Sequence, residues 1–342
     1  MTNIDKALEY LKDYSQKTKP IYDEMLEELC GRAEEVGELP LQAMTKFGDI
    51  AGGGKRLRGA LVQLGYELSG GLDNSEILIA GLIQEITHAA ILVDDDVMDE
   101  ADLRRGFPTI HSIFGEGVAT CLADSVYFFA FEKLLGLQFP AEELKEASKF
   151  YTASISNLGF GQMLDIGKSD SPKSEADILT MLWLKSGEYS VHTPLKFGAL
   201  LAGITDSTWL DNLKGYSKSL GWAFQISDDL LGSFGDTNKT GKPVDSDIRE
   251  GKNTLLVLHL RQHGSVEQKE ILERYLGKLD LKEAEFQEVL QVFTDSGARQ
   301  ALENKCTDLV TEGKTYIPKL TKDENKSNIL NGLLEYMLVR ET

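Results

Sequence analysis

The sequence predicts an all-α protein, and three observations support this prediction. Alternation with a period of two, the mark of strands, is rare along the chain. The eight prolines stand mainly at glycine-containing breaks. Apolar residues between 4 and 36 recur close to the helical period of 3.6, at Ile4, Leu8, Leu11, Tyr14, Ile21, Met25 and Leu29.

Glycine and proline breaks divide the chain into helical segments of about 15 to 30 residues. No fixed-period repeat, low-complexity stretch or long linker separates them. We therefore expect residues 1–342 to form one large helical domain. The breaks are expected at 37–40, 52–54, 70–71, 136–140, 169–172, 203–207 and 232–251.

The composition bounds the class of protein and its partners. With 42% hydrophobic and 27% charged residues, the chain resembles an ordinary globular protein. A net charge of −19 argues against nucleic acid or anionic membranes as partners, because both require a basic face. Anionic small substrates stay possible, because local cations or a bound metal can reverse the sign within a pocket.

The cysteines and the N-terminus favour a cytoplasmic location. Cys30, Cys121 and Cys306 are far apart and odd in number, as expected for reduced thiols. Residues 1–19 are charged and amphipathic, so we expect no signal peptide there. The apolar runs are core-sized, so we expect no transmembrane segment.

The first acidic segment, residues 84–106, places six carboxylates directly after an apolar run. On a helix, Asp95 and Asp99 are four residues apart and share one face, where they repel and require a cation. Mg²⁺ suits such carboxylates together with substrate phosphates. The alternative is a solvated acidic face, which the apolar run and the following Arg104 and Arg105 disfavour.

A basic segment precedes the first acidic segment. Three glycines at 52–54 lead into Lys55 and Arg58, just before an expected helix. Helix-terminal N–H groups and nearby cations suit a diphosphate, although a solvated basic loop is an alternative. His88 lies two helical turns before Asp95 and is either a core histidine or a phosphate contact.

Polar residues in the second half of the chain form further candidates. Gln162 and Asp165 lie one helical turn apart and are either a structural pair or part of a site. Lys185 and Ser186 follow an apolar stretch, where the lysine either reaches water or faces a polar cavity.

The second acidic segment, residues 224–236, is again flanked by apolar residues. One helical face carries Gln225, Asp228, Asp229 and Gly232. The loop that follows is long and basic, as expected of a mobile lid that brings charge to a substrate, and it contains Lys239, Lys242, Arg249 and Lys252.

These segments together resemble the trans-isoprenyl diphosphate synthases, and the resemblance covers about residues 50–255. The two acidic helices lie 133 residues apart (Asp95 to Asp228), each beside a basic segment. The family motif DDxxD-x4-RRG matches Asp95, Asp96, Asp99, Arg104, Arg105 and Gly106, and GKRxR matches Gly54, Lys55, Arg56 and Arg58. GQxxD matches Gln162 and Asp165, and KS matches Lys185 and Ser186. FQxxDD matches Phe224, Gln225, Asp228 and Asp229, and GK with DIxxGK matches Gly241, Lys242, Asp247, Ile248, Gly251 and Lys252.

Three positions depart from the family pattern. Gly59 replaces a common proline, with a small expected effect on the backbone. Asp94 replaces a histidine and adds a negative charge near the metals. Gly232 replaces the third aspartate of the second motif, as in some geranylgeranyl-type members, so a ligand role at this position is in doubt.

The resemblance implies an isoprenoid-synthase helical bundle, a homodimer and condensation of isopentenyl diphosphate with allylic diphosphates. It implies three Mg²⁺ ions bound by Asp95, Asp99 and Asp228. The departing diphosphate would be stabilised by Arg104, Lys185 and Lys242, and Lys252 would also bind substrate. The homoallylic diphosphate would be bound by Lys55, Arg58, His88 and Arg105. Gln225 and Ser186 would direct dipoles towards the allylic cation.

Product length is expected to depend on the residues before Asp95, where short-chain members carry bulky aromatics. Here these positions are the small or aliphatic Thr87, Ala90 and Ile91, so we expect a C20 product or somewhat longer. The next helix carries aromatic residues that either form a deeper floor or belong to the core, namely Tyr127, Phe128, Phe129 and Phe131.

Two other functions share parts of this pattern. A class I terpene cyclase has the first acidic motif, but it usually carries an NSE-type second site and needs no homoallylic site. A non-catalytic subunit of a prenyl synthase generally loses one acidic motif, whereas both remain here.

Overall fold

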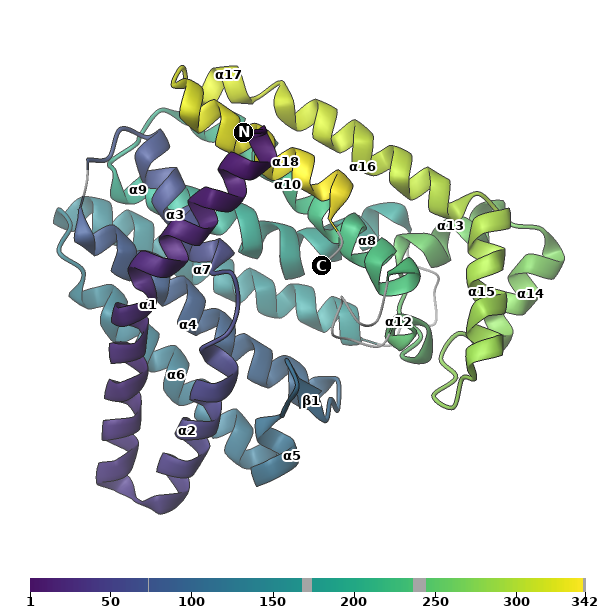
Figure 1. Ribbon diagram of the computed structural model, residues 1–342, viewed down its shortest axis with the longest axis horizontal. Coiled ribbons are helices and arrows are strands. Elements are labelled where there is room, and N and C mark those ends of the chain that lie inside the picture. The colour runs from purple at the N-terminus through teal and green to yellow at the C-terminus, as the bar shows by residue number, and fades with distance from the viewer. Residues whose placement is uncertain (73, 168–173, 236–243, 341–342) are drawn as a thin grey trace. The chain divides into compact units, whose positions relative to one another are not determined.

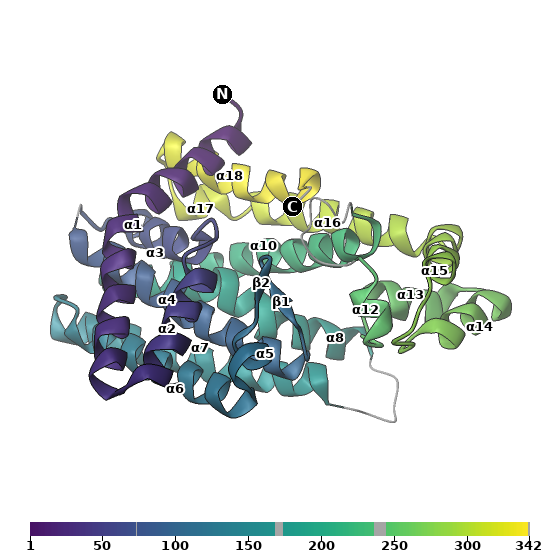
Figure 2. The ribbon, with the colours of Figure 1, turned by 60° about the horizontal axis from the view of Figure 1, so that its bottom comes forward.

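The computed structural model describes residues 1–72, 74–167, 174–235 and 244–340. Its regular structure is helical except for one short hairpin, which confirms the predicted all-α fold (Figure 1 and Figure 2). The chain divides into two compact units. The N-terminal unit comprises residues 8–151 and 194–205, and the C-terminal unit comprises 1–7, 152–193 and 206–342.

The N-terminal unit contains the basic segment and the first acidic segment. The hairpin β1–β2 within it was not predicted, because each strand has two residues. The elements are α1 (Asn3–Val36), α2 (Glu38–Ala51), α3 (Leu57–Leu68), α4 (Ser75–Met98), β1 (Leu103–Arg104), β2 (Phe107–Pro108), α5 (Ile110–Phe114), α6 (Glu116–Gly136), α7 (Ala141–Ile166) and α9 (Thr193–Leu201), where α1, α7 and α9 contribute residues to both units.

Helix α4 is the central element of the N-terminal unit. The Asn74 side chain caps it by accepting a hydrogen bond from the backbone of Glu76 at 2.9 Å. It packs against α3 and α6 and buries Leu82, Ile83 and Ile86 completely, a gain of about 2 kcal/mol for each side chain.

The apolar character of α4 has a second possible reading. By length and composition alone Ser75–Met98 could span a membrane, but 61% of its most apolar window is buried inside the protein. Packing in a core therefore accounts for this composition.

The C-terminal unit is built around α10, which packs against α16, α18 and η1 (Figure 1). The side chain of Asp206 caps α10 through the backbone N–H groups of Thr208 and Trp209. The elements that lie wholly in this unit are α8 (Glu175–Leu182), the π-helix η1 (Trp183–His192), α10 (Ser207–Phe234), α12 (Ser246–Arg249), α13 (Leu255–His263), α14 (Val266–Tyr275), α15 (Glu283–Asp295), α16 (Ala298–Lys314), α17 (Ile317–Leu320) and α18 (Glu324–Val339).

The π-helix η1 is packed backbone to backbone on its neighbours. A Cβ atom added at Gly221 of α10 would lie 2.8 Å from Cα of Gly187 in η1. A Cβ added at Gly161 of α7 would lie 2.5 Å from the backbone nitrogen of Lys185. Glycine is therefore required where α7 and α10 approach η1, and the backbone of Lys185 is held in place by these contacts.

Candidate active site

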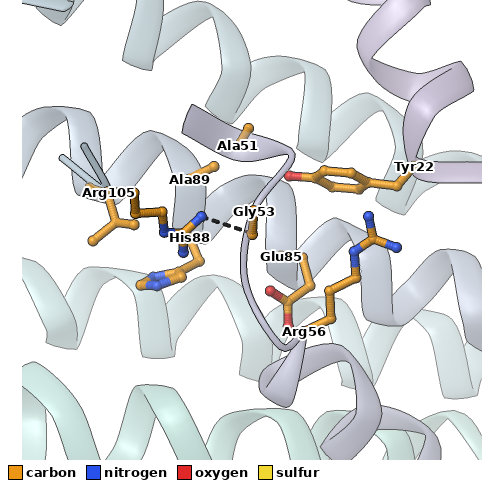
Figure 3. A pocket seen from close by; sticks show the side chains of 9 residues that line it. Tyr22, Ala51, Gly53, Arg56, Glu85, His88, Ala89 and Arg105 are labelled. Carbon is orange, nitrogen blue, oxygen red and sulfur yellow. Dashed lines mark hydrogen bonds between the residues drawn. The ribbon is translucent and has the colours of Figure 1, made fainter. Parts of the chain in front are cut away.

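A basic pocket lies in the N-terminal unit where the loop after α2 meets α1 and α4 (Figure 3). It has about 260 Å³ of empty space, part of which is open solvent. The lining residues are Tyr22, Ala51, Gly53, Arg56, Glu85, His88, Ala89, Leu92 and Arg105. Of the predicted diphosphate ligands, the pocket therefore brings together His88 and Arg105.

Arg105 is fixed against the glycine-rich loop. Its Nη1 donates a hydrogen bond of 2.8 Å to the backbone oxygen of Gly53 (Figure 3) and another of 2.8 Å to that of Ile50. A Cβ at Gly53 or Gly54 would come within 3.2 or 3.1 Å of the guanidinium nitrogens. The glycines thus let the loop lie directly on Arg105, which orients this cation at the pocket.

Arg56 has a structural role in the same loop. It has a left-handed backbone (φ 51°) and is buried. Its Nη1 donates to the backbone oxygen of Ser15 and to Thr18, and its guanidinium lies 4.7 Å from the ring centroid of Tyr22. Arg56 therefore anchors the loop to α1.

Glu85 is an unpredicted carboxylate in the basic pocket. Its Oε1 accepts a hydrogen bond of 2.7 Å from the backbone N–H of Gly59. Burial raises the pKa of Glu85, while the charges of Arg58, Arg56 and Arg105 and the Gly59 hydrogen bond oppose this rise. Glu85 thus offsets part of the repulsion among the arginines.

The contact with Glu85 corrects the interpretation of Gly59. A proline at this position would lose the N–H group that Glu85 accepts. A Cβ would also lie 2.5 Å from the hydroxyl of the buried Tyr14. The substitution of the common family proline is therefore tied to Glu85 and Tyr14 and is more than a small backbone effect.

His88 lies one helical turn after Glu85. Desolvation, followed by the positive charges of Arg58, Arg105 and Arg104, holds the pKa of His88 well below its usual range. The imidazole is consequently neutral near pH 7 and offers one N–H donor. Arg58 is half-buried and Lys55 is exposed.

The carboxylates Asp94, Asp95 and Asp96 of the first acidic segment lie near the C-terminal end of α4, and Asp99 follows directly. The backbone N–H of Asp99, the C-terminal cap, donates to the backbone oxygen of Asp95 at 2.8 Å, so the expected i, i+4 relation is present. Asp96 faces inwards and accepts from Nε and Nη2 of Arg104 at 2.8 and 2.5 Å. The two side chains are 2% and 10% exposed, so this ion pair is buried.

The end of α4 explains how Arg104 reaches Asp96. Glu100 has a positive φ of 50°, and the backbone N–H of Ala101 donates to the backbone oxygen of Asp96 at 2.9 Å, so the chain changes direction directly after the helix. Arg104 then lies in β1, and Arg105 and Gly106 connect β1 to β2 with positive φ values of 53° and 83°. Two consecutive residues of positive φ form the tight turn that suits a two-residue hairpin.

Asp94, which replaces a family histidine, is engaged by α6. Its Oδ2 accepts a hydrogen bond of 2.6 Å from the hydroxyl of Tyr127. Burial raises the pKa of Asp94, and the charges of Asp124 and Asp95 add to this rise. The Tyr127 hydrogen bond acts in the opposite direction and favours the charged form.

The C-terminal unit contains a second acidic cluster, which we define as Asp165, Asp228, Asp229 and Asp247. Asp229 is its buried member. Burial raises the pKa of Asp229 to about 8, with further increases from Asp247, Asp228 and Asp165 and a decrease from the Gln225 hydrogen bond of 3.1 Å. Its Oδ2 is buried and accepts no hydrogen bond from any described residue.

Cations of the same unit contact the other three carboxylates. Lys185 donates to Asp165 at 2.5 Å, and Arg340 donates to Asp228 at 2.5 Å. Lys252 lies 3.6 Å from Asp247. The structure therefore places the predicted Lys185, Asp228 and Lys252 in one cluster. Arg340 belongs to the same cluster, but it was not predicted from the sequence.

Gly232 lies beside the same cluster. A Cβ at this position would lie 3.4 Å from Oδ2 of Asp247. An aspartate at 232, as in the family motif, would bring another carboxylate next to Asp247.

The donors fit Mg²⁺ by their chemistry. All are carboxylate oxygens, and the pKa of Asp229 is raised mainly by burial and further by the charges of Asp247, Asp228 and Asp165, which a divalent cation would offset. Within the described ranges, no three His, Cys, Asp or Glu side chains form a ready-made metal cage. Mg²⁺ commonly uses one or two carboxylates and completes its coordination with water and substrate phosphates. A Mg²⁺ site is therefore compatible with the lack of a three-residue cage in the described ranges.

The remaining predicted site residues are Lys242, Ser186 and Gln162. Lys242 and part of the expected lid lie outside the described residues, while the described part of that loop contains α12. Ser186 lies half-buried in η1, a π-helix that the sequence did not predict, and Gln162 is buried in α7.

The predicted product-length residues lie on α4 in the N-terminal unit. Ala90 and Thr87 are buried and Ile91 is half-buried. Thr87 accepts a hydrogen bond of 2.9 Å from the hydroxyl of Tyr151, whose ring lies 5.1 Å from that of Phe197.

The aromatic residues of α6 do not behave as one group. Phe129 is buried and Phe131 is half-buried, whereas the side chain of Phe128 is 74% exposed. For Phe128, both readings, tunnel floor and core residue, are wrong.

Comparisons with known proteins assign the chain to a family. The model of the polyprenyl synthetase family matches residues 42–293. The chain belongs to the polyprenyl synthetase family. It is therefore a trans-prenyltransferase, and the family predicted from the motifs is confirmed.

Individual members of the polyprenyl synthetase family match over most of the chain. The geranylgeranyl diphosphate synthase of Sulfolobus acidocaldarius is 32% identical over 307 residues, which cover 88% of this chain and 90% of the relative. The geranylfarnesyl diphosphate synthase of Aeropyrum pernix is 31% identical over 300 residues, covering 85% and 92%.

A solved structure in the polyprenyl synthetase family agrees with the fold. The crystal structure of geranylgeranyl pyrophosphate synthase from Corynebacterium glutamicum, complexed with isoprenyl diphosphate and magnesium, matches with a TM-score of 0.90. It is 26% identical, and the match covers 96% of this chain and 99% of that chain.

Four residues make contacts at these positions that were not predicted from the sequence. Glu85 had a local signal, because it lies one turn before His88 on the same helix face. Tyr127, Tyr151 and Arg340 had none, because they lie 33, 64 and 112 residues from their partners.

Proposed function

We propose that the chain is a Mg²⁺-dependent enzyme that condenses isopentenyl diphosphate head-to-tail with an allylic diphosphate. The observation that carries the proposal is the basic pocket, where Arg105 is held by the glycine-rich loop beside a neutral His88. A terpene cyclase acts on a single diphosphate and needs no such second anion site.

The two diphosphates would bind to different residues. Lys55, Arg58, His88 and Arg105 would bind the homoallylic diphosphate, with Glu85 limiting the mutual repulsion of the cations. The allylic diphosphate would be bound by Lys185, Lys242 and Lys252, with Arg104 stabilising the developing charge.

The metals would be held by Asp95 and Asp99 and by Asp228, with three ions expected in all. When bound, Mg²⁺ supplies positive charge to the departing diphosphate. The all-oxygen donor set and the carboxylates gathered around the buried Asp229 support this assignment.

The reaction would proceed by loss of diphosphate from the allylic substrate. The double bond of isopentenyl diphosphate attacks the resulting carbocation and forms the new carbon–carbon bond. A proton then leaves the adjacent carbon for the released diphosphate. Gln225 and Ser186 would direct their side-chain dipoles towards the cation.

The product would be geranylgeranyl diphosphate (C20) or somewhat longer. Ala90 and Ile91 leave no bulky barrier near Asp95. Thr87, tied to Tyr151, would mark the end of the space available to the growing tail. The geranylgeranyl and geranylfarnesyl synthases among the relatives support this range.

The proposal includes a cytoplasmic homodimer in which residues 1–342 act as one catalytic domain. Helices α1 and α7, which contribute residues to both units, support the single domain. The exposed Phe128 and Leu135 on α6, each 74% exposed, support a partner surface there. Light scattering of wild type and of a Phe128→Asp, Leu135→Asp double variant would test it, and a monomeric wild type would refute the homodimer.

A product assay tests the function. Purified protein with Mg²⁺, isopentenyl diphosphate and geranyl or farnesyl diphosphate should yield a longer prenyl diphosphate by chromatography, and EDTA should abolish it. A cyclic hydrocarbon from the allylic substrate alone would instead identify a cyclase. Failure with every allylic primer would refute prenyl elongation.

Two variants refine the assay. Arg58→Gln should raise the KM for isopentenyl diphosphate far more than the KM for the allylic substrate, whereas Lys145→Gln, at an exposed cation of α7, should change neither. Ala90→Phe should shorten the product, with the melting temperature measured to confirm folding. An unchanged product from folded Ala90→Phe would refute the tunnel assignment.

A further inference from the structure

Arg340 contacts the second acidic segment, although it lies far along the chain. It caps the C-terminal end of α18 with an extended backbone (φ −65°, ψ 131°). Its Nη1 donates to Oδ1 of Asp228 at 2.5 Å, and its guanidinium lies 4.5 Å from the ring centroid of Phe224. The Arg340 and Asp228 side chains are 17% and 35% exposed, so water screens the pair only in part.

This contact conflicts with metal binding at Asp228. A guanidinium and a divalent cation at the same carboxylate would lie within a few ångströms of each other and repel. Its neighbour Asp229 differs, because the uncharged amide of Gln225 holds it. Arg340 thus satisfies electrostatically the carboxylate that the proposed function assigns to the metal.

Arg340 can leave without loss of α18. The helix is anchored upstream by the hydrogen bond of 2.9 Å from the Tyr216 hydroxyl to the backbone of Leu330 and by the Lys314–Glu335 ion pair of 2.7 Å. Arg340 itself follows the last helical turn, where rotation of the side chain breaks no helical hydrogen bond.

We propose that Arg340 is a positioning residue that holds Asp228 in the metal-free enzyme and is displaced when a divalent cation binds there. The inference rests on the proposed role of Asp228 as a metal ligand. After displacement, the guanidinium gains a new partner in the diphosphate that enters with the metal. Arg340 therefore weakens binding of the metal alone and strengthens the coupling between metal and diphosphate.

The test measures binding without turnover. Mn²⁺ replaces Mg²⁺ as probe, and electron paramagnetic resonance of free Mn²⁺ gives its Kd for the full chain, with and without inorganic pyrophosphate. Arg340→Gln should bind Mn²⁺ alone about fivefold more tightly, because a competing part-exposed ion pair is removed. Pyrophosphate should then tighten Mn²⁺ binding less than in the wild type.

Two variants serve as controls. Arg340→Lys keeps the charge and should stay close to the wild type. Arg299→Gln removes a guanidinium that lies 4.6 Å from another α10 ring, Phe234, but pairs with Glu303 of its own helix, so it should leave both Kd values unchanged. Circular dichroism checks that each variant is folded.

The outcomes separate two kinds of failure. If Arg340→Gln binds Mn²⁺ as the wild type does, or more weakly, while Asp228→Asn loses affinity, the exchange is overturned and the ligand role of Asp228 stands. If Asp228→Asn binds Mn²⁺ like the wild type, both the exchange and the ligand role are overturned.

Discussion

The two acidic segments have similar sequences but stabilise their carboxylates in different ways. In the first, the inward-facing Asp96 is paired with Arg104, eight residues away, and both side chains are almost fully buried. In the second, the inward-facing Asp229 receives only a neutral amide among the contacts described, and the nearest cation contact is to its neighbour Asp228.

This difference shows that the buried carboxylate of one motif can be paired with an arginine while that of its counterpart contacts only a neutral amide. The Asp96–Arg104 pair neutralises the buried charge of the first segment independently of any ligand. The second acidic cluster keeps a carboxyl whose pKa is raised to about 8, so it gains more from an external cation. The first segment is pre-organised, whereas the second depends on what binds.

The largest expected effects come from the proposed metal ligands. Asp95→Asn should lower kcat on the order of a thousandfold, and Asp228→Asn should lower it less, because the first segment supplies two ligands. Asp124→Asn, at an exposed position of α6, is the matched control and should keep wild-type activity. Steady-state kinetics at saturating Mg²⁺ compares the loss of kcat in the two variants. A larger loss for Asp228→Asn than for Asp95→Asn would contradict the prediction.

The buried carboxylates should differ in stability. Asp96→Asn leaves the buried Arg104 without its counter-charge and should lower the free energy of unfolding by about 3 kcal/mol. Asp229→Asn replaces a carboxyl that is largely protonated at neutral pH by a neutral amide, so it should cost far less there. Urea denaturation in EDTA compares the two variants, and equal losses would contradict the distinction.

Much of this architecture was predictable because its causes are local. The helices follow from apolar periodicity. Helical spacing places Asp95 and Asp99 on one face of their helix and Asp228 on the same face as Gln225 of another helix. Arg104 reaches Asp96 through the change of chain direction at Glu100 and Ala101, only a few residues away. Only the hairpin itself is too short to leave a periodic signal.

The remainder was not predictable because its causes are distant in sequence. The contact of Arg340 with Asp228 spans 112 residues, and no spacing rule links them. The π-helix at Lys185 depends on close glycine contacts with α7 and α10. The role of Gly59 became interpretable only with the positions of Tyr14 and Glu85.

The pH dependence should separate the two segments further. Because the pKa of Asp229 lies near 8 when folded and 3.8 otherwise, the folded protein retains a proton between these pH values that the unfolded chain has lost. The contribution of Asp229 to stability should therefore fall as pH rises from about 4 to 8. Melting temperatures in EDTA should show this slope, and Asp229→Asn should remove it. A slope that persists in the variant would assign it to other groups.

The smallest expected effect concerns Tyr127. Tyr127→Phe removes the hydrogen bond to Asp94 and should lower the free energy of unfolding by about 1 kcal/mol. The companion variant Tyr151→Phe removes the hydrogen bond to Thr87 and should also shift product length, whereas Tyr127→Phe should not. Denaturation and product chromatography measure both effects. Identical product profiles for the two variants would contradict the proposed role of Thr87 and Tyr151 in product length.

The glycine contacts of η1 limit how this enzyme can diversify. A Cβ at Gly161 or Gly221 would meet backbone atoms that cannot move aside like a flexible side chain, and a Cβ at Gly187 would lie 3.1 Å from the ring of Trp183. A mutant library that includes these positions would lose most of its folded members, because any added side chain separates the helices. Libraries confined to Thr87, Ala90 and Ile91 avoid this limit, so new product lengths can evolve on α4 while the segment that holds Lys185 stays unchanged.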